Sequence, residues 1–195
     1  EGFLFFRKVT EVIHRHGAAA CAQLHMSDTD TAAVAGLMPK LKAGIISMDE
    51  MRRFMNSRVR PFITQMPAER IHSIAEGFGK SAVRLEQAGF DMVQIHGDRM
   101  CGSFSSSVFN HRTDAYGGSA ENRARFAVEA VRAVRSRLPE LPIDYKLAVR
   151  QEDPHYGNAG VLESELGIFV PLLVEAGVTS FHVTLANHSS LEDTI

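Results

Sequence analysis

The residues best placed to do chemistry follow a short apolar segment near the middle of the chain. Residues 90–95 (FDMVQI) are typical of a buried strand, and His96 stands directly after them. Arg99 and Cys101 follow shortly, at the start of a long loop rich in Ser, Asn, Asp and Gly. In α/β proteins, active-site groups lie in such loops, after the carboxyl end of a parallel strand. His96 is therefore the first candidate for a catalytic residue.

Two further polar residues lie within other apolar segments. Lys146 lies in residues 143–149 (IDYKLAV), and Gln23 lies near the end of residues 18–24 (AAACAQL). A lysine amine can form a Schiff base with a carbonyl substrate, so a non-redox lyase or aldolase is one hypothesis. Side chains alternate along a strand, and the sequence leaves open whether Lys146 faces the centre of the domain or the surrounding helices.

Apolar periodicity and turn residues divide the chain into alternating helices and strands. Helices are expected at 3–16, 47–56, 67–87, 119–138 and 162–176, and strands at 18–24, 90–95, 143–149 and 180–185. Pro171 is expected to kink the last helix or to delay its start. Apart from a short helix that opens with a capping box at Ser47 and Glu50, residues 25–66 are expected to form an irregular excursion.

Strands that alternate with helices and are buried on both faces indicate a parallel α/β sheet. An open doubly wound sheet and a (β/α)8 TIM barrel both fit this order. No Gly-rich phosphate-binding fingerprint follows any strand, which weakens the open sheet. A barrel usually needs about 250 residues, whereas this chain has 195. We therefore expect one domain over residues 1–195 that forms about four units of a TIM barrel and is incomplete at both ends.

The composition argues against several classes of partner. A formal net charge of −2 gives no reason to expect nucleic acid or an anionic membrane surface. No apolar run approaches the roughly 20 residues of a membrane span. Cys21 and Cys101 lie far apart, which fits neither a disulfide framework nor a zinc site, so we expect no metal and a reduced, cytoplasmic protein.

Two segments resemble the Old Yellow Enzyme family of NADH:flavin oxidoreductases, also called ene-reductases. They are AGFDMVQIHG at 88–97 and NHRTDAYGGSAENRARF at 110–126. The resemblance begins at residues 22–24, extends to the fourth strand and is poor over 25–66. It implies strands three to six of an FMN-binding TIM barrel. It also implies hydride transfer from NADH or NADPH, through the flavin, to an activated C=C bond of an unsaturated carbonyl or carboxylate, as in the enoate and dienoyl-CoA reductase branches.

The resemblance assigns cofactor contacts to three residues. Gln23 is expected to bond the pyrimidine edge of the flavin, because an amide both donates and accepts hydrogen bonds. Lys146 stands where the family usually has an arginine near flavin N1 and O2, where a cation stabilises the anionic reduced flavin. Lysine keeps that charge but lacks the planar guanidinium. Arg150, four residues later, is the alternative cation.

The resemblance also assigns substrate contacts and a proton donor. His96 matches the first residue of a pair that holds the substrate carbonyl oxygen. Arg99 replaces the second residue, usually His or Asn, and favours an anionic substrate such as a carboxylate. Cys101 replaces the tyrosine that often donates the proton, and we interpret it as a small space-filling residue. His188 is then the candidate acid, with Tyr156 as the second choice.

The best-matching residues are expected to build the scaffold: Asp114, Tyr116, Gly117, Gly118, Glu121, Asn122, Arg123 and Arg125. The glycines permit a tight turn, and the charged side chains can tie the loop to the barrel.

Arg99 and Cys101 differ from the residues usual in the family, so a catalytically degenerate flavin-binding domain is a further alternative. The sequence does not determine the alkene, the nicotinamide or the oligomeric state, for which a homo-oligomer is one option. Any iron–sulfur cluster would lie outside this segment.

Overall fold

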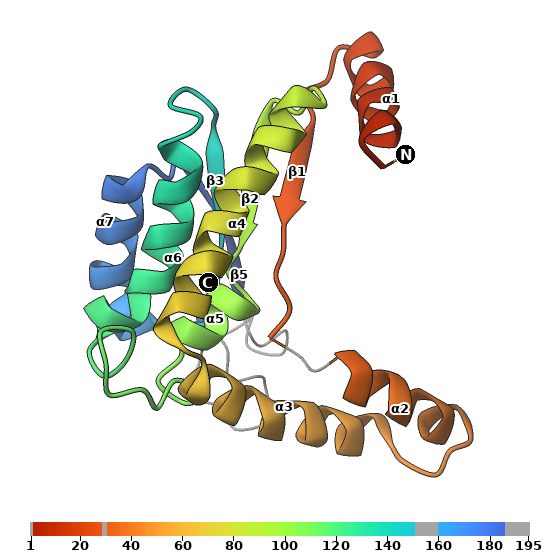
Figure 1. The fold of residues 1–195 in the computed structure, drawn as a ribbon, viewed down its shortest axis with the longest axis vertical. Coiled ribbons are helices and arrows are strands. Elements are labelled where there is room, and N and C mark those ends of the chain that lie inside the picture. Colours follow the sequence, from red (N-terminus) through yellow and green to blue (C-terminus); the bar gives the residue numbers. More distant parts are fainter. Residues whose placement is uncertain (1, 29–30, 151–159, 186–195) are drawn as a thin grey trace.

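Parallel strands and the helices that connect them make up the body of the protein (Figure 1). The computed structural model describes residues 2–28, 31–150 and 160–185. Its elements are α1 (Gly2–Arg15), β1 (Cys21–Leu24), α2 (Thr31–Lys42), α3 (Met48–Gln65), α4 (Ala68–Gln87), β2 (Met92–His96), α5 (Met100–Ser105), α6 (Ala120–Arg135), β3 (Ile143–Arg150), β4 (Val161–Leu162), a 3-10 helix (Glu163–Glu165), α7 (Leu166–Ala176) and β5 (Ser180–Leu185). None of the helices in these ranges is long and apolar enough to cross a membrane.

The strands form one sheet in which every pairing is parallel. β2 lies between β1 and β3, β5 also pairs with β3, and the short β4 pairs with the carboxyl end of β3. The four strands expected from the sequence correspond to β1, β2, β3 and β5. The predicted parallel α/β organisation is therefore confirmed.

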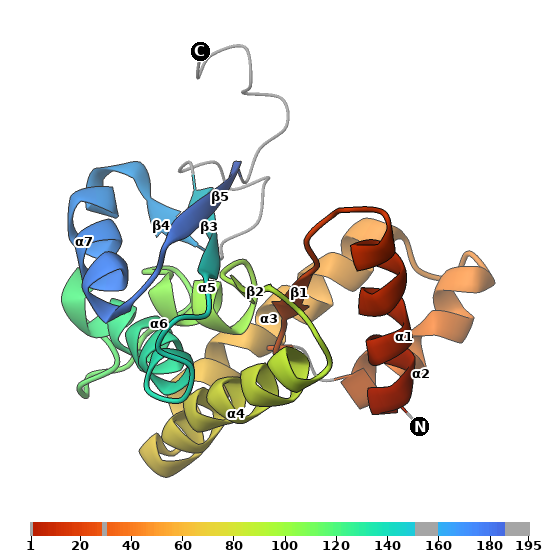
Figure 2. The ribbon, with the colours of Figure 1, turned by 90° about the horizontal axis from the view of Figure 1, so that it is seen from above.

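One face of the sheet is covered by a layer of helices. Helix α6 packs between α4 and α7 on this face, and two views at right angles show the layer (Figures 1 and 2). Val93, Ile95 and Tyr145 of the strands are buried beneath it, and Phe126 of α6 packs edge-on against Phe78 of α4. This burial of apolar surface is the main source of stability for such a layer.

The opposite face of the sheet is open, which corrects the expectation of strands buried on both faces. Along β1, Ala22 and Leu24 are buried, whereas Cys21 and Gln23 are exposed. His182 of β5 is also exposed. The physical reason is that the described helices pack against only one side of the strands. In a closed barrel, the residues on the open side would face the barrel axis.

Residues 25–66 are more regular than the sequence predicted. The capping box at Ser47 and Glu50 is confirmed, but α3 runs on to Gln65, and α2 was not expected. Helix α3 passes through Pro61, where the proline lacks one backbone donor. Val59 and Ile63, on either side of Pro61, are buried, and this packing offsets the lost hydrogen bond.

The last helix begins later than the periodicity suggested. Residues 161–165 form β4 and a 3-10 turn, and α7 starts at Leu166 with Pro171 inside it. The delayed start agrees with the expected effect of this proline on the helix. The predicted end is confirmed, because Gly177 caps α7 with a φ of 121°.

The long loop before α6 is held by buried side-chain hydrogen bonds to backbone carbonyls. Arg112 donates to the carbonyl oxygens of Ile63, Thr64 and Met66 at the end of α3, at 2.7–3.1 Å, and forms an ion pair with Asp114. In the same loop, the Asn110 amide donates to the carbonyls of Phe104 and Tyr116. Arg123 of α6 donates to the carbonyl of Ser105. The scaffold role expected for this segment agrees with these contacts.

Replacing Arg112 with alanine tests how much this anchor contributes. The Arg112 side chain is 7% exposed, so its loss leaves three carbonyl groups and Asp114 without their partner. We expect the free energy of unfolding to fall by about 3 kcal/mol in urea denaturation. Arg125→Ala, an exposed arginine of the same segment that bonds the Ala115 carbonyl, should cost less than about 1 kcal/mol. Equal losses in the two variants would contradict the anchoring role.

Candidate functional site

Four basic side chains gather at the carboxyl end of the sheet. His96 is the last residue of β2, and the register places it beside Lys146 of β3, which in turn lies beside His182 of β5. Register neighbours on adjacent strands point to the same face. His25 follows β1, and its ring meets that of His96 edge-on at 4.8 Å between centroids. The sequence left the orientation of Lys146 open, and the structure places it on the open face with His96.

The chain turns sharply out of β2 at Gly97. The amide of Gly97 donates to the carbonyl oxygen of Lys146 at 2.9 Å. A Cβ atom at this position would lie 2.1 Å from that oxygen, so only glycine allows so close an approach. The turn places Asp98 beside Lys146 of β3 and near His96 at the end of β2.

Asp98 connects these groups, and sequence reasoning missed it. One of its carboxylate oxygens lies 2.5 Å from Lys146 Nζ and 3.8 Å from His96 Nε2. The other oxygen accepts a hydrogen bond from Thr184 Oγ1 of β5 at 3.3 Å. The available signal was the acidic residue two positions after a strand-end histidine, beside a strand that carries a lysine.

His96 is mostly enclosed, with 13% of its side chain exposed. Its Nδ1 atom is buried and makes no hydrogen bond within the described residues. Burial lowers the pKa of His96, the positive charges of Lys146, His25 and Arg99 lower it further, and Asp98 opposes them. A buried ring nitrogen without a partner costs free energy, so it is a natural point of contact for a bound molecule.

Gln23 of β1 lies on the same open face, in the row that pairs with Gln94, two residues before His96 in β2. Its side chain donates to Gln94 of β2 at 2.5 Å, and Gln94 donates to Asp144 of β3 at 2.5 Å. Gln23 of β1 and Lys146 of β3 therefore lie on one face of the sheet, with β2 between their strands, as a joint cofactor site requires. Gln94 and Asp144 were not singled out from the sequence, because a strand pattern does not reveal which neighbours share a row.

Of the other candidate site residues, the structure describes the side chain of Arg99 but not those of Arg150, His188 and Tyr156. Arg99 is exposed at the amino-terminal end of α5 and contributes positive charge near His96. Arg150 is the last residue of β3, and its side chain lies outside the described part of the structure, as do His188 and Tyr156 altogether. The roles proposed for these three residues stay predictions.

Cys101 has the environment of a core residue. It is fully buried in α5, and burial raises the pKa of its thiol to about 12, against an opposing hydrogen bond from Tyr145. A thiol of this kind is not a nucleophile near neutral pH. The structure thus agrees with the interpretation of Cys101 as a space-filling residue.

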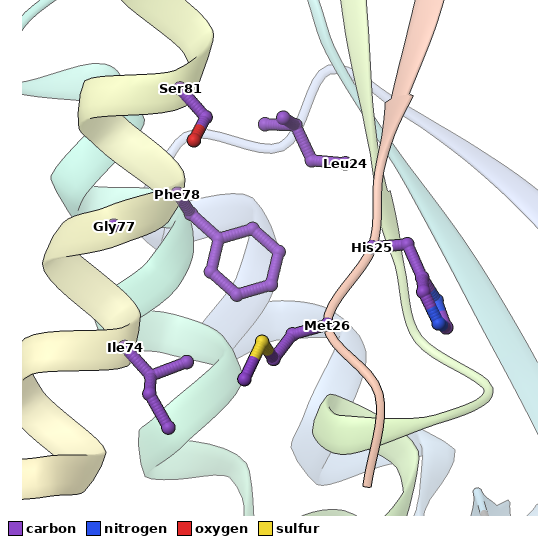
Figure 3. A pocket seen from close by; sticks show the side chains of 7 residues that line it. All are labelled: Leu24, His25, Met26, Ile74, Gly77, Phe78 and Ser81. Atoms are coloured by element: carbon purple, nitrogen blue, oxygen red, sulfur yellow. The ribbon is translucent and has the colours of Figure 1, made fainter. Parts of the chain in front are cut away.

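A small, mostly apolar cavity lies on the side of β1 that faces α4, and His25 is the one residue that it shares with the basic cluster. It has a volume of about 200 Å³ and is bordered by Leu24, Met26, Ile74 and Phe78. Leu24 and Met26 point toward α4, whereas His25 points away from it (Figure 3). The cavity therefore lies between α4 and the segment that contains β1 and the residues just after it. Within the described ranges, no group of three or more His, Cys, Asp or Glu side chains could hold a metal ion.

Known proteins with related sequences align with this chain over most of its length. It is 60% identical over its full length to a bilirubin reductase of Clostridium symbiosum, of which it spans 52%. It is 29% identical over 87% of its length to a cinnamate reductase of Clostridium sporogenes, of which it spans 26%. The chain thus spans about half the length, or less, of these curated relatives.

Solved structures show the same fold. A structure of 2-naphthoyl-CoA reductase superposes with a TM-score of 0.55 at 26% identity, over 63% of this chain and 19% of that one. Morphinone reductase in complex with tetrahydroNAD gives a TM-score of 0.51 at 31% identity, over 60% and 33%. An Old Yellow Enzyme homologue from Zymomonas mobilis gives 0.53 at 24% identity, over 62% and 34%. The sheet and its helices are part of a TIM barrel, as the sequence predicted.

The family can be stated from the extent of the sequence match. Residues 4–178 match the sequence model of the NADH:flavin oxidoreductase / NADH oxidase family. This range contains β1, β2 and β3, with Gln23, His96 and Lys146. The protein therefore belongs to the NADH:flavin oxidoreductase / NADH oxidase family.

Proposed function

We propose that the full-length protein is an FMN-dependent reductase that uses NADH or NADPH to reduce a conjugated C=C bond. The observation that carries this proposal is the arrangement of Gln23, Lys146 and His96 on one open face of the sheet. The family resemblance assigns a flavin or substrate contact to each of these residues. The unpartnered Nδ1 of His96 supports a bound molecule at this face.

The donor set of the open face fits a flavin. Gln23 offers an amide to the pyrimidine edge, and Lys146 offers a cation near the ring system. When bound, FMN supplies a two-electron carrier that takes hydride from a nicotinamide and passes it to an alkene. Asp98 fixes the lysine ammonium through their 2.5 Å contact, so the cation is positioned before any ligand arrives.

The positive charge around His96 favours an anionic substrate. Lys146 and Arg99 contribute positive charge near it, and Asp98 balances one of these charges. A similar reductase acts on bilirubin, and this chain is 60% identical to it. Bilirubin is a conjugated tetrapyrrole that carries two carboxylate groups. We therefore propose bilirubin or a related tetrapyrrole as the substrate, with Arg99 holding a carboxylate and His96 a polar atom of the reacting conjugated unit.

The two alternatives from the sequence are less well supported. A Schiff-base lyase needs Lys146 as a free amine, whereas its nitrogen forms an ion pair with Asp98. A degenerate flavin-binding domain would keep Gln23 and Lys146 but lose turnover. The proton donor remains a proposal as well, with His188 as the candidate.

The proposed function has a direct test. The purified full-length protein should be yellow, should contain about one FMN per chain and should oxidise NADH or NADPH when bilirubin is added without oxygen. The measurement is the flavin absorbance together with the loss of bilirubin colour. A colourless protein that takes up no FMN would contradict the whole proposal. Stoichiometric FMN without turnover would favour the degenerate flavoprotein.

Replacing Lys146 with methionine tests its place beside the flavin. Methionine keeps the length of the side chain but removes the charge that stabilises the reduced cofactor. We expect flavin reduction by NAD(P)H in stopped-flow experiments to slow by about 10²-fold. Lys80→Met, on the exposed side of α4, is the matched control and should keep the wild-type rate. An unchanged rate in the Lys146 variant would place this residue outside the flavin site.

The electrostatics of His96 can be tested by NMR titration of its ring. Because burial lowers the pKa of His96, the midpoint of its titration should lie below the ordinary value for a histidine. Lys146→Met removes a positive charge that opposes protonation, so it should raise the pKa of His96. Asp98→Asn removes the negative charge that favours protonation, so it should lower this pKa further. Shifts in the opposite directions would contradict the arrangement of charges.

A further inference from the structure

A row of hydrogen-bonded side chains crosses the open face of the sheet. It passes through Gln94, two residues before His96 in β2. Gln23 Nε2 donates to Gln94 Oε1 at 2.5 Å, and Gln94 Nε2 donates to Asp144 Oδ2 at 2.5 Å. Ser180 Oγ donates to the second oxygen of the carboxylate, Asp144 Oδ1, at 2.7 Å. The four residues are register neighbours, so the row spans β1, β2, β3 and β5.

The carboxylate of Asp144 determines which group of each side chain in this row donates a hydrogen bond and which accepts one. Asp144 is 8% exposed, and an ionised carboxylate accepts hydrogen bonds but donates none. Gln94 must therefore turn its NH2 group toward Asp144 and its oxygen toward Gln23. Gln23 must in turn direct its own NH2 group toward Gln94. Within the described residues, the carbonyl oxygen of Gln23 is the free end of the row.

Without such a fixed end, a glutamine amide has no preferred direction. Its oxygen and nitrogen ends are nearly equal in size, and a rotation of 180° exchanges donor and acceptor. The imide at the pyrimidine edge of a flavin places an N–H donor between two carbonyl acceptors. An amide that faces this N–H has to present its oxygen, because its NH2 group would oppose the N–H.

We propose that Asp144 and Gln94 are positioning residues that fix the amide of Gln23 with its oxygen directed toward bound FMN. This inference rests on the proposed function, in which Gln23 contacts the flavin. Asp144 touches neither cofactor nor substrate, and acts through two successive hydrogen bonds. The carboxylate on β3 thereby determines the hydrogen-bonding pattern that β1 offers to the cofactor.

The substitution Asp144→Asn removes the fixed direction while keeping the size of the side chain. Asparagine can donate as well as accept, so the row can run in either sense and Gln23 can flip. We expect the dissociation constant of FMN in the full-length protein to rise about tenfold, together with a change in the midpoint potential of the flavin. Fluorescence titration of the apoprotein with FMN measures the first quantity, and spectroelectrochemistry measures the second.

Asp91→Asn is the matched control. Asp91 stands just before β2, at the opposite end of the strands, where it accepts hydrogen bonds from the Ala20 amide at 2.7 Å and from His14 at 2.8 Å. This variant loses a hydrogen-bonded carboxylate of the same sheet but leaves the row intact. We expect its FMN dissociation constant and midpoint potential to equal those of the wild type.

A double-mutant cycle shows whether Asp144 acts through Gln23. In a Gln23→Ala background, Asp144→Asn should no longer change the dissociation constant of FMN. Gln94→Met, which cuts the row between Gln23 and Asp144, should weaken FMN binding to a similar degree and lose its effect in the same background. If Asp144→Asn does not fold, Gln94→Met carries the test alone.

The outcomes separate this inference from the proposed function. A wild-type protein that binds no FMN would contradict both the proposed function and this inference. Tight FMN binding in the wild type with unchanged binding and potential in Asp144→Asn would overturn the inference alone. The same holds if Asp144→Asn or Gln94→Met weakens FMN binding equally with and without Gln23.

Discussion

The parallel register of β1, β2 and β3 is the constraint on which the site depends. It sets Gln23 beside Gln94 and Asp144 in one row, and His96 beside Lys146 in the next. A shift of one residue in any strand would turn its polar side chains into the helix layer. The apolar residues between them, such as Val93 and Ile95, are buried under the helices and hold this register.

Two local features convert the register into a site with defined charges. The close approach at Gly97 brings the next residues back over the strand ends, where Asp98 meets Lys146. The buried Arg112 then fastens the following loop to α3. Residues 110–126 therefore hold this loop against α3 and α5.

The sequence predicted the strands and most helices well, because their signals are local. Gly17, Gly89 and Gly177 end helices with positive φ, and the apolar face of α6 shows in the spacing of its residues. The site was predicted only in part. His96, Lys146 and Gln23 could be found by type and position, and the family resemblance supplied the roles that we propose for them.

What could not be predicted depends on contacts between distant segments. The ion pair of Asp98 and the row that leads to Asp144 arise from pairing between strands about 50 residues apart or more. Likewise, α3 continues through Pro61 because its flanking residues are buried by other parts of the chain. Local propensity favours a break at a proline, and tertiary packing overrides it.

We propose that the open face of the sheet, with Gln23 on β1 and Lys146 on β3, holds the flavin. A crystal structure of the full-length protein with FMN bound tests it most directly. We expect the pyrimidine edge of the ring to lie within hydrogen-bond distance of the Gln23 carbonyl oxygen, with Lys146 Nζ beside the ring system and His96 facing the space next to it. A flavin bound elsewhere, with Gln23 and Lys146 both out of contact, would contradict the account.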